Sequence, residues 1–409
     1  MTTAPYPPTG PLADLTPVPL YSEEFAADPH AAYAWMRQRF GSLVPVELHP
    51  GVPATLVIGY YTALRVLHDP VRFPADPRIW QSTVPADCPI LPMTGWRPNA
   101  LRNSGAAHER YRSANSAALD AVDLHHLRAT VQRAARDLIT DLARHGQADL
   151  VTQYALPLAF QVLNALLDCP PRISVQVADG MARVFDSAQG AGQGEAMISQ
   201  ALAALVALKR ADPGDDITSR LIAHHTRLSD EELVHQLVTL YGAGIEPQTH
   251  LIANALRLTL TDERFAGSVI GGSLTVRDAL EEVLHRNPPL AQYCLSYPPL
   301  PVVIDGVLLP AHQPVVIGMA ACNSDPAVAR AGRVGNRSHL AFSAGAHACP
   351  ARTPAYVIAQ SAVELLIDAL PEMQLAVPAD ELRWRPGPFH RALASLPVRF
   401  PTSVPVPVR

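Results

Sequence analysis

The middle of the chain carries apolar residues at intervals of three and four positions, which is the spacing of one face of a helix. The segments LITDLARHG and LVTQYALPLAFQVLNALL show this pattern, and it continues with breaks from Leu124 to Ala223. Within this region SAQGAGQGE is rich in glycine and indicates a break between two helices. The pattern therefore predicts a largely helical body.

Two shorter stretches have the features of hairpins. LVPVELHPGVPATLVI, residues 43–58, places two runs rich in β-branched residues around His-Pro-Gly. VVIDGVLLPAHQPVVI turns at Asp305-Gly306, a dipeptide that favours hairpin turns, and a further strand is expected after Pro310. No internal repeat or shift of composition marks a domain boundary. We predict a mainly α fold with small β sheets, forming one large domain over residues 25–409 after a proline-rich tail at 1–24.

The segment LSDEELVHQLVTL has the features of a helix start. Ser229 can cap the first turn, and Glu232, three residues later, completes a capping box. Leu228 and Leu233 occupy the positions of a hydrophobic staple. We therefore expect a helix to begin directly after Ser229.

Composition limits the class of protein. The 409 residues are 48% hydrophobic and 17% charged, values typical of a globular chain. A net charge of −5 supplies no basic surface, so we expect no nucleic-acid partner. The proline-rich N-terminus has no signal-peptide pattern, and the most apolar later stretch, AMISQALAALVALKR, is too short to cross a bilayer. We therefore expect a soluble protein without membrane attachment.

The cysteines are scattered along the chain without CxxC spacing. They are Cys88, Cys169, Cys294, Cys322 and Cys349. This distribution argues against a disulfide framework or a zinc site and fits a reducing compartment. We therefore expect the protein to be cytoplasmic.

One of these cysteines, Cys349, lies in an apolar, glycine-punctuated loop, HLAFSAGAHACPARTPAYVIAQ, at residues 339–360. A cysteine among alanines is most often a small buried hydrophobe. Here, however, Pro350 suits the first turn of a helix, and a sulfur just before a helix N-terminus meets free N–H groups that favour thiolate. Gly345 allows the loop to approach a flat group closely. A thiolate in an apolar pocket is one of the ligands by which proteins hold haem iron.

Residues 339–355 resemble the haem loop of the cytochromes P450, whose pattern is F-G-x-G-x-H/R-x-C-x-G. The residues that match it, and that the resemblance places against the cofactor, are Phe342, Gly345, His347 and Cys349. Ser343 and Ala351 stand where the family usually has glycine, and both are small enough for the loop. The resemblance implies a haem b cofactor (iron protoporphyrin IX), with Cys349 as the axial iron ligand and His347 in contact with a propionate.

The similarity continues in the family's order from about residue 25 to the end of the chain. PGDDITSRLIAHHTRLSDEELVHQLVTLYGAG resembles the segment that leads into the long helix over the haem. AHERYR, residues 107–112, resembles the H-x-x-x-R that binds propionates, which gives this role to His108 and Arg112; by themselves these two residues would more often belong to a solvated helix face. ALEEVLHRNPPL resembles the helix that carries the ExxR motif. The chain is thus similar to the soluble bacterial members of the family.

The segment expected over the haem departs from the family pattern, A-G-x-D/E-T, in which the threonine hydroxyl relays protons during oxygen activation. The corresponding residues here are Ala243, Gly244, Ile245, Glu246 and Pro247. Pro247 takes the threonine position, offers no hydroxyl and frees the carbonyl of Ala243. Gln248 and Thr249 lie about 100° and about 200° further round the helix, so neither replaces the hydroxyl. Proton delivery would then fall to Glu246, an ordered water or a substrate hydroxyl.

A second departure affects the ExxR pair, which has a structural role. Aligned on Pro288 and Pro289, the sequence retains Glu282 but has His285 where the family has arginine. Histidine neither forms the two-pronged pair with a carboxylate reliably nor stays charged at every relevant pH. We favour the interpretation in which His285 still hydrogen-bonds Glu282 and holds the fold less firmly.

Two further arginines of the family have no clear counterpart. The one that normally joins the ExxR pair from the segment before the haem loop has two candidates, Arg333 and Arg337. The one that usually binds a propionate after the proline pair is not found in AQYCLSYPPL. These features resemble a subgroup of actinobacterial P450s that lack the ExxR arginine and are often encoded beside small-GTPase and sensor-kinase genes. A signalling protein is therefore a candidate partner.

The resemblance implies a monooxygenase that inserts one oxygen atom of dioxygen into an apolar small molecule, with electrons from a ferredoxin. Pro247 and His285 keep two alternatives open. One is a haem-containing ligand sensor that works with signalling partners. The other is a peroxygenase, because peroxide supplies oxygen that is already protonated.

Overall fold

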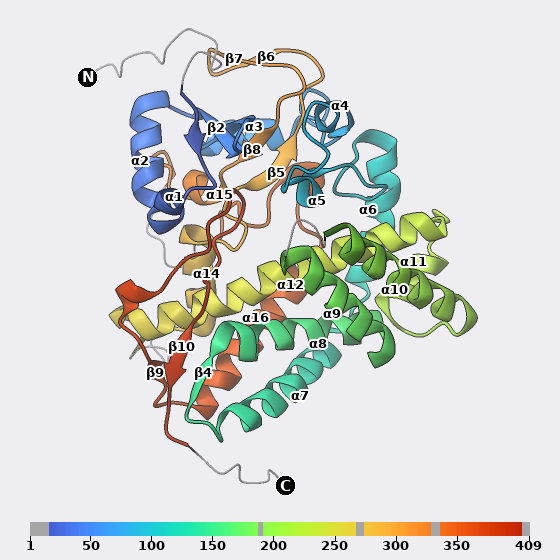
Figure 1. The fold of residues 1–409 in the computed structure, drawn as a ribbon, viewed down its shortest axis with the longest axis vertical. Coiled ribbons are helices and arrows are strands. Elements are labelled where there is room, and N and C mark those ends of the chain that lie inside the picture. The colour runs from blue at the N-terminus through green and yellow to red at the C-terminus, as the bar shows by residue number, and fades with distance from the viewer. Residues whose placement is uncertain (1–15, 187–190, 267–273, 329–335, 403–409) are drawn as a thin grey trace.

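The computed structural model describes residues 16–186, 191–266, 274–328 and 336–402. A body of helices fills one part of the molecule, and a five-stranded sheet with the N-terminal helices lies beside it (Figure 1). This arrangement confirms the mainly α fold with small sheets.

The helices are α1 (Glu23–Ala27), α2 (Pro29–Phe40), α3 (Tyr60–Leu67), α4 (Arg78–Gln81), α5 (Leu91–Thr94), α6 (Gly105–Asp120), α7 (Leu124–Leu142), α8 (Leu156–Leu167), α9 (Pro171–Asp186), α10 (Ala191–Ala211), α11 (Ile217–Ala223), α12 (Asp230–Thr261), α13 (Glu263–Ala266), α14 (Val276–Arg286), α15 (Met319–Asn323) and α16 (Arg352–Ala369), with short helical turns η2 (Val151–Ala155), η3 (Gly345–His347) and η4 (Ala379–Glu381). The strands are β1 (Val18–Pro19), β2 (Leu43–His49), β3 (Val52–Val57), β4 (Gln147–Asp149), β5 (Tyr293–Ser296), β6 (Val302–Ile304), β7 (Val307–Leu309), β8 (Val315–Ile317), β9 (Gln374–Leu375) and β10 (Pro397–Arg399).

The largest sheet has the strand order β1-β2-β3-β8-β5. Strands β2 and β3 form the hairpin expected at residues 43–58, with Leu43 opposite Val57. Strands β6 and β7 form the second expected hairpin, which turns at Asp305-Gly306, and β8 is the further strand that follows it. Strand β1 pairs with β2 in parallel, so residues that the sequence placed in the tail take part in the sheet.

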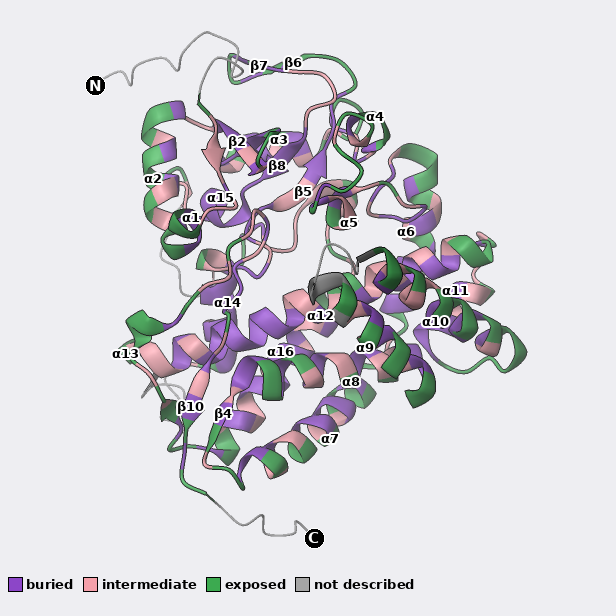
Figure 2. Ribbon diagram, viewed as in Figure 1, coloured by how far each residue is buried: buried purple, intermediate pink, exposed green. Residues whose placement is uncertain are grey.

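The longest described helix, α12, crosses the helical body and lies against α8, α14 and α16 (Figure 1). It begins with the capping box expected at Ser229 and Glu232. Its C-terminal half is largely buried, as Figure 2 shows, and Leu251 and Ile252 belong to the main hydrophobic core. Pro247 lies inside the helix, which continues on both sides of it. Close packing of the residues after Pro247 therefore fixes the segment expected over the haem.

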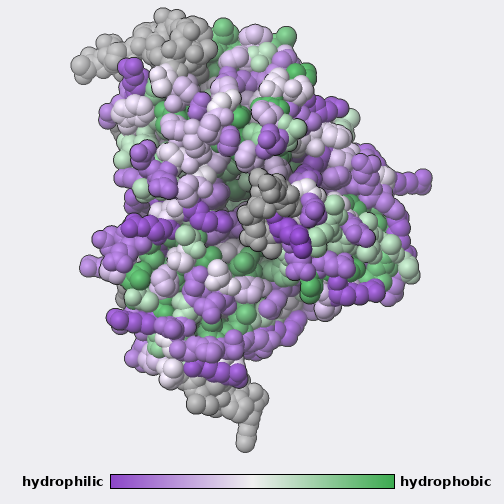
Figure 3. Space-filling view, viewed as in Figure 1, coloured by the Kyte–Doolittle hydropathy of each residue, from purple (hydrophilic) through white to green (hydrophobic). Residues whose placement is uncertain are grey.

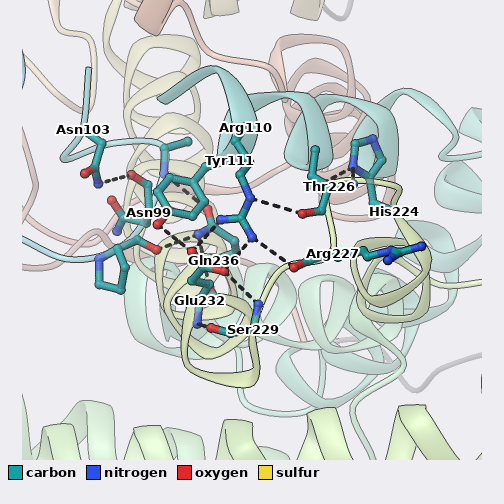
Figure 4. Close-up of polar contacts among 12 residues, drawn as sticks. Asn99, Asn103, Arg110, Tyr111, His224, Thr226, Arg227, Ser229, Glu232 and Gln236 are labelled. Atoms are coloured by element: carbon teal, nitrogen blue, oxygen red, sulfur yellow. Dashed lines mark hydrogen bonds and ion pairs between the residues drawn. The ribbon is translucent and has the colours of Figure 1, made fainter. Parts of the chain in front are cut away.

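A polar network joins α6 to the start of α12 (Figure 4). Arg110 of α6 donates two hydrogen bonds to the Glu232 carboxylate, with Nη1–Oε1 and Nη2–Oε2 distances of 2.5 Å and 2.9 Å. The hydroxyl of Tyr111 donates to the same carboxylate at 2.9 Å, and the backbone N–H of Ser229 donates to it at 2.8 Å. The helix that carries the expected propionate-binding residues is thus attached to the helix expected over the haem.

The Glu232 carboxylate makes the stability of the protein depend on pH. Hydrogen bonds, that from Arg110 foremost, lower the pKa of Glu232 to about 2 in the folded protein. An unfolded glutamate has a pKa of about 4.3. The folded state therefore prefers the ionised carboxylate. This stabilisation is complete above the unfolded value and is lost as the pH falls towards the folded value.

We expect the free energy of unfolding in urea to be higher for wild type than for Glu232→Gln at neutral pH, and the difference to shrink as the pH falls from about 5 to about 2. Glu372→Gln removes an exposed carboxylate outside this network and serves as the control for the loss of a charge. A difference for Glu232→Gln that stays constant over this pH range would contradict this role.

None of the helices in the described part of the chain is long and apolar enough to span a membrane. On the face drawn in Figure 3, hydrophilic and apolar side chains are interspersed, and the apolar colour forms separate patches, one of them over the region of α10. Large exposed apolar residues are also spread over the sheet side, among them Trp35, Tyr61 and Leu300. The apolar surface is therefore local rather than a continuous belt on this face.

Candidate functional site

Cys349 lies in the loop between η3 and α16, on a backbone fixed by its own hydrogen bonds. Its N–H donates to the carbonyl of Phe342 at 2.8 Å, and the N–H of Ala348 donates to the carbonyl of Gly345 at 3.1 Å. Gly345 has a φ of +68°, and a Cβ there would collide with the carbonyl oxygen of Leu67. Only glycine fits this position, so the loop can lie close to α3.

The surroundings of Cys349 have opposing effects on the pKa of its thiol. Burial raises the pKa of the Cys349 thiol, whereas the N–H of Ala351 and the positive charges of Arg112 and Arg352 lower it. The Cys349 residue keeps exposed surface, so a ligand can reach it. Because a coordinating metal ion deprotonates a thiol outright, the raised pKa does not oppose an axial thiolate. Helix α16 begins at Arg352, so Pro350 lies in the turn before the helix rather than in its first turn.

Four basic side chains gather beside this loop: Arg102, His108, Arg112 and His347. The rings of His108 and His347 lie 4.2 Å apart between their centroids. Arg112 donates from Nη2 to the carbonyl of Ala348, next to the cysteine. Burial, and after it the positive charge of the three neighbouring basic residues, lowers the pKa of His347 to about 3. The cluster therefore brings two guanidinium groups and two imidazole rings together beside the loop, and the His347 ring is neutral at neutral pH.

This cluster fits the two propionates of a haem. Nε2 of His108 is buried and has no hydrogen-bond partner in the described part of the chain. Within the same residues, no carboxylate pairs with Arg102 or Arg112, whose hydrogen bonds go to carbonyl and hydroxyl oxygens. Buried positive charges without counter-ions are unfavourable, and two carboxylates would neutralise them. The Cys349 thiol and basic side chains that could pair with two carboxylates thus lie together, an arrangement that fits a haem.

Glu246, from which we expect proton delivery, contacts the segment that follows α16. Its carboxylate forms an ion pair with Arg385 and lies 3.3 Å from Nε2 of His250, one helical turn along α12. Nη2 of Arg385 lies 3.1 Å from the same nitrogen. Burial lowers the pKa of His250 to about 4, so its ring is neutral at neutral pH. Nδ1 of His250 is buried without a hydrogen-bond partner among the residues described.

The residues around Pro247 are engaged by neighbouring helices. At Gly244 a Cβ would come within 3.3 Å of Leu163, so α8 and α12 approach closely there. Gln248 donates from Nε2 to the carbonyl of Ala355 in α16 at 3.2 Å. Thr249 is buried, and its hydroxyl has no partner within the described ranges. The contact of Gln248 with α16 agrees with the expectation that it does not replace the missing hydroxyl.

A buried polar cluster lies at α14, and its centre is Glu281. Its carboxylate accepts hydrogen bonds from Arg277 at 2.9 Å and from the hydroxyl of Tyr356 at 3.0 Å, and it lies 3.3 Å from Nε2 of His339. Arg337, one of the two arginines considered from the sequence, lies 3.8 Å from it. Burial alone would raise the pKa of Glu281, but these hydrogen bonds lower it to about 2. The sequence did not identify this carboxylate.

His285 lies in the same region and contacts the segment before the haem loop. Its Nε2 lies 2.9 Å from the carbonyl oxygen of Asn336, and its ring packs edge-on against His339 at 5.2 Å. This geometry differs from the hydrogen bond to Glu282 that we favoured, because the ring is directed to the backbone of that segment. Arg333, the other candidate arginine, lies outside the described residues.

Sequence reasoning missed three residues of the site: Arg102, His250 and Arg385. Arg102 and Arg385 come from irregular segments far along the chain from their partners, and no spacing marks them. His250 carried one weak signal, since it follows Glu246 by four residues and therefore lies on the same face of the helix.

No family model matches the chain. The chain is 31% identical over 398 residues to the cytochrome P450 monooxygenase PikC of Streptomyces venezuelae, with 92% of each chain covered. It is 28% identical to the 6-deoxyerythronolide B hydroxylase of Saccharopolyspora erythraea, covering 94% of this chain and 100% of that one. The solved structure of CYP154C4 from Streptomyces sp. W2061 superposes with a TM-score of 0.85 at 26% identity, over 94% of this chain and 98% of that one. This likeness confirms the expected fold.

Proposed function

The chain belongs to the cytochrome P450 family of monooxygenases, and from this premise we propose that it inserts one oxygen atom of dioxygen into an apolar small molecule in the cytoplasm. Cys349 is the proposed axial ligand of a haem b, and a ferredoxin is the proposed electron donor. The observation that carries the proposal is the position of Cys349 beside His108, Arg112 and His347. When bound, the haem supplies the oxidising chemistry, and the protein supplies its ligand, its orientation and its surroundings.

The residues of the haem loop hold the cofactor in this proposal. The N–H of Ala351 and the charges of Arg112 and Arg352 favour the thiolate form of Cys349. His108, Arg112 and His347 bind the propionates and so fix the haem relative to α6. Gly345 lets the loop pack against Leu67 of α3, which fixes the backbone that leads to His347 and Cys349.

Glu246 is the proposed source of protons, with Arg385 and His250 as its supports. Arg385 orients the carboxylate through their ion pair. A proton taken up from solvent can reside either on the Glu246 carboxylate or on Nε2 of the neutral His250 ring, which lies 3.3 Å away, and can be passed on from there. This route does not need the hydroxyl that Pro247 lacks.

The relatives support an organic small molecule as substrate. Besides the 6-deoxyerythronolide B hydroxylase, they include the vitamin D(3) 25-hydroxylase of Pseudonocardia autotrophica, which is 29% identical to this chain. Both names describe hydroxylation of one organic molecule. We propose the same type of reaction here, on an apolar small molecule.

A ligand sensor that works with signalling partners is the second candidate, because the chain resembles a subgroup of P450s without the ExxR arginine that are often encoded beside signalling genes. Pro247 favours it, because the helix over the haem lacks the hydroxyl that oxygen activation normally uses. His285, at the arginine position, is a further feature of that subgroup. A peroxide-driven peroxygenase is the third candidate, and the same loss of the hydroxyl favours it.

A turnover experiment separates these candidates. The haem-loaded protein is incubated with a library of apolar small molecules, first with ferredoxin, its reductase and NADPH, and then with peroxide alone, while ligand binding is followed by the haem spin state. We expect oxygenated product with ferredoxin and NADPH. Product with peroxide alone would support a peroxygenase. Tight ligand binding without product under either condition would support the sensor and contradict the proposal.

A further inference from the structure

We propose that Arg102 binds one propionate of the haem, from a loop outside both segments in which the sequence placed propionate-binding residues. The inference rests on the proposed haem and adds a residue to that same site. Arg102 would take the place of the propionate-binding arginine that the family usually has after the proline pair and that this chain lacks after Pro288 and Pro289.

The loop that carries Arg102 is attached to α12 by side-chain amides (Figure 4). Gln236, which is fully buried in α12, donates from Nε2 to the carbonyl of Pro98 at 2.9 Å. Asn99 donates to the hydroxyl of Thr239 at 2.7 Å, and its Oδ1 accepts the N–H of Arg102 at 3.0 Å. The backbone of Arg102 is therefore held in place without any help from its guanidinium.

The Arg102 side chain extends from this loop to β5. The residue is only 4% exposed. Its Nη2 donates to the carbonyl of Met93 and to the hydroxyl of Tyr293, and its Cζ lies 5.5 Å from the centre of the Tyr293 ring. Both hydrogen bonds use Nη2, which leaves Nη1 and Nε for another acceptor. Tyr293 begins β5, the strand that follows the proline pair. The Arg102 guanidinium therefore lies beside the strand on which the family usually has its propionate-binding arginine.

The charge of Arg102 has no counter-ion within the described ranges, where no carboxylate pairs with it. Its loop leads directly into α6, whose first turns carry the basic residues His108 and Arg112. A buried guanidinium in such company is unfavourable unless an anion lies among these groups. A propionate is an anion of suitable charge, and the planar guanidinium binds carboxylates with paired hydrogen bonds.

A purely structural role would consist of linking Met93 to Tyr293. That role does not depend on the propionates. An experiment that varies both Arg102 and the propionates therefore distinguishes the structural role from propionate binding. Wild type, Arg102→Gln and Arg102→Met are loaded with haem or with haem dimethyl ester, which has no ionised carboxylates. Methionine keeps the apolar bulk of the side chain without its charge, so it guards against misfolding of the glutamine variant. The transfer of each porphyrin to an excess of apomyoglobin is then timed.

We expect both variants to lose haem about 10- to 100-fold faster than wild type. With the dimethyl ester, we expect the variants and wild type to release the porphyrin at similar rates. Arg37→Gln is the matched control, because it removes a guanidinium that donates to the carbonyls of Ile58 and Ala321, and it should release haem at the wild-type rate. Thermal unfolding of the haem-free proteins measures any structural effect separately.

Unchanged haem loss in both variants would overturn the role of Arg102 and leave the proposed haem intact. The role of Arg102 would also be overturned if the variants released haem and its dimethyl ester faster than wild type by the same factor. A wild-type protein that takes up neither porphyrin would overturn the proposed function, and this inference with it.

Discussion

Replacing Cys349 with alanine is expected to lower oxygenated product formation at least about a thousandfold, because the iron would lose its only proposed protein ligand. His108, Arg112 and His347 remain in this variant, so part of the haem should still be bound. The measurement is product formed per bound haem with ferredoxin, reductase and NADPH. Haem content is determined separately, so that loss of the cofactor is not mistaken for loss of its ligand.

Cys88→Ala is the matched control for this variant, since Cys88 is a buried free cysteine outside the haem loop. It should retain wild-type turnover. If Cys349→Ala with bound haem forms product at the rate of Cys88→Ala, Cys349 is not the axial ligand.

Replacing Glu246 with glutamine is expected to lower the product formed per NADPH consumed about 100- to 1,000-fold. Glutamine keeps the size of the side chain and can still accept a hydrogen bond from Arg385, but it cannot exchange a proton with His250. NADPH consumption should continue without product. The ratio of product to NADPH is therefore the quantity to measure, together with its solvent isotope effect.

Glu364→Gln is the control for the loss of a carboxylate, because Glu364 accepts a hydrogen bond from Gln360 at 2.8 Å on α16 and lies outside the Glu246 cluster. Its ratio of product to NADPH should equal that of wild type. An equally unchanged ratio in Glu246→Gln would show that protons arrive by another route, such as an ordered water or a substrate hydroxyl.

The elements that could be predicted from the sequence are those whose signal and partner lie close together in the chain. The hairpin of β2 and β3 and the turn at Asp305-Gly306 each depend on a few neighbouring residues. The capping box of Ser229 and Glu232 spans one helical turn. The resemblance of the Cys349 loop to the family's haem loop likewise depends on residues that are close in sequence, and the role of Cys349 as haem ligand stays a prediction.

The contacts that could not be predicted join residues that are distant in sequence. Arg385 reaches Glu246 across 139 residues, and Arg102 reaches Tyr293 across 191 residues. No periodicity encodes such pairs, because they depend on how whole elements pack. For His285 the substitution was visible in the sequence, but its contact with Asn336 depends on the path of the segment before the haem loop.

The absorption spectrum of the reduced, carbon-monoxide-bound protein tests most directly whether Cys349 holds a haem as thiolate. We expect a strongly red-shifted Soret band in wild type. A haem-loaded wild-type protein without that shift, or a colourless protein that takes up no added hemin, would contradict the proposed haem-thiolate site.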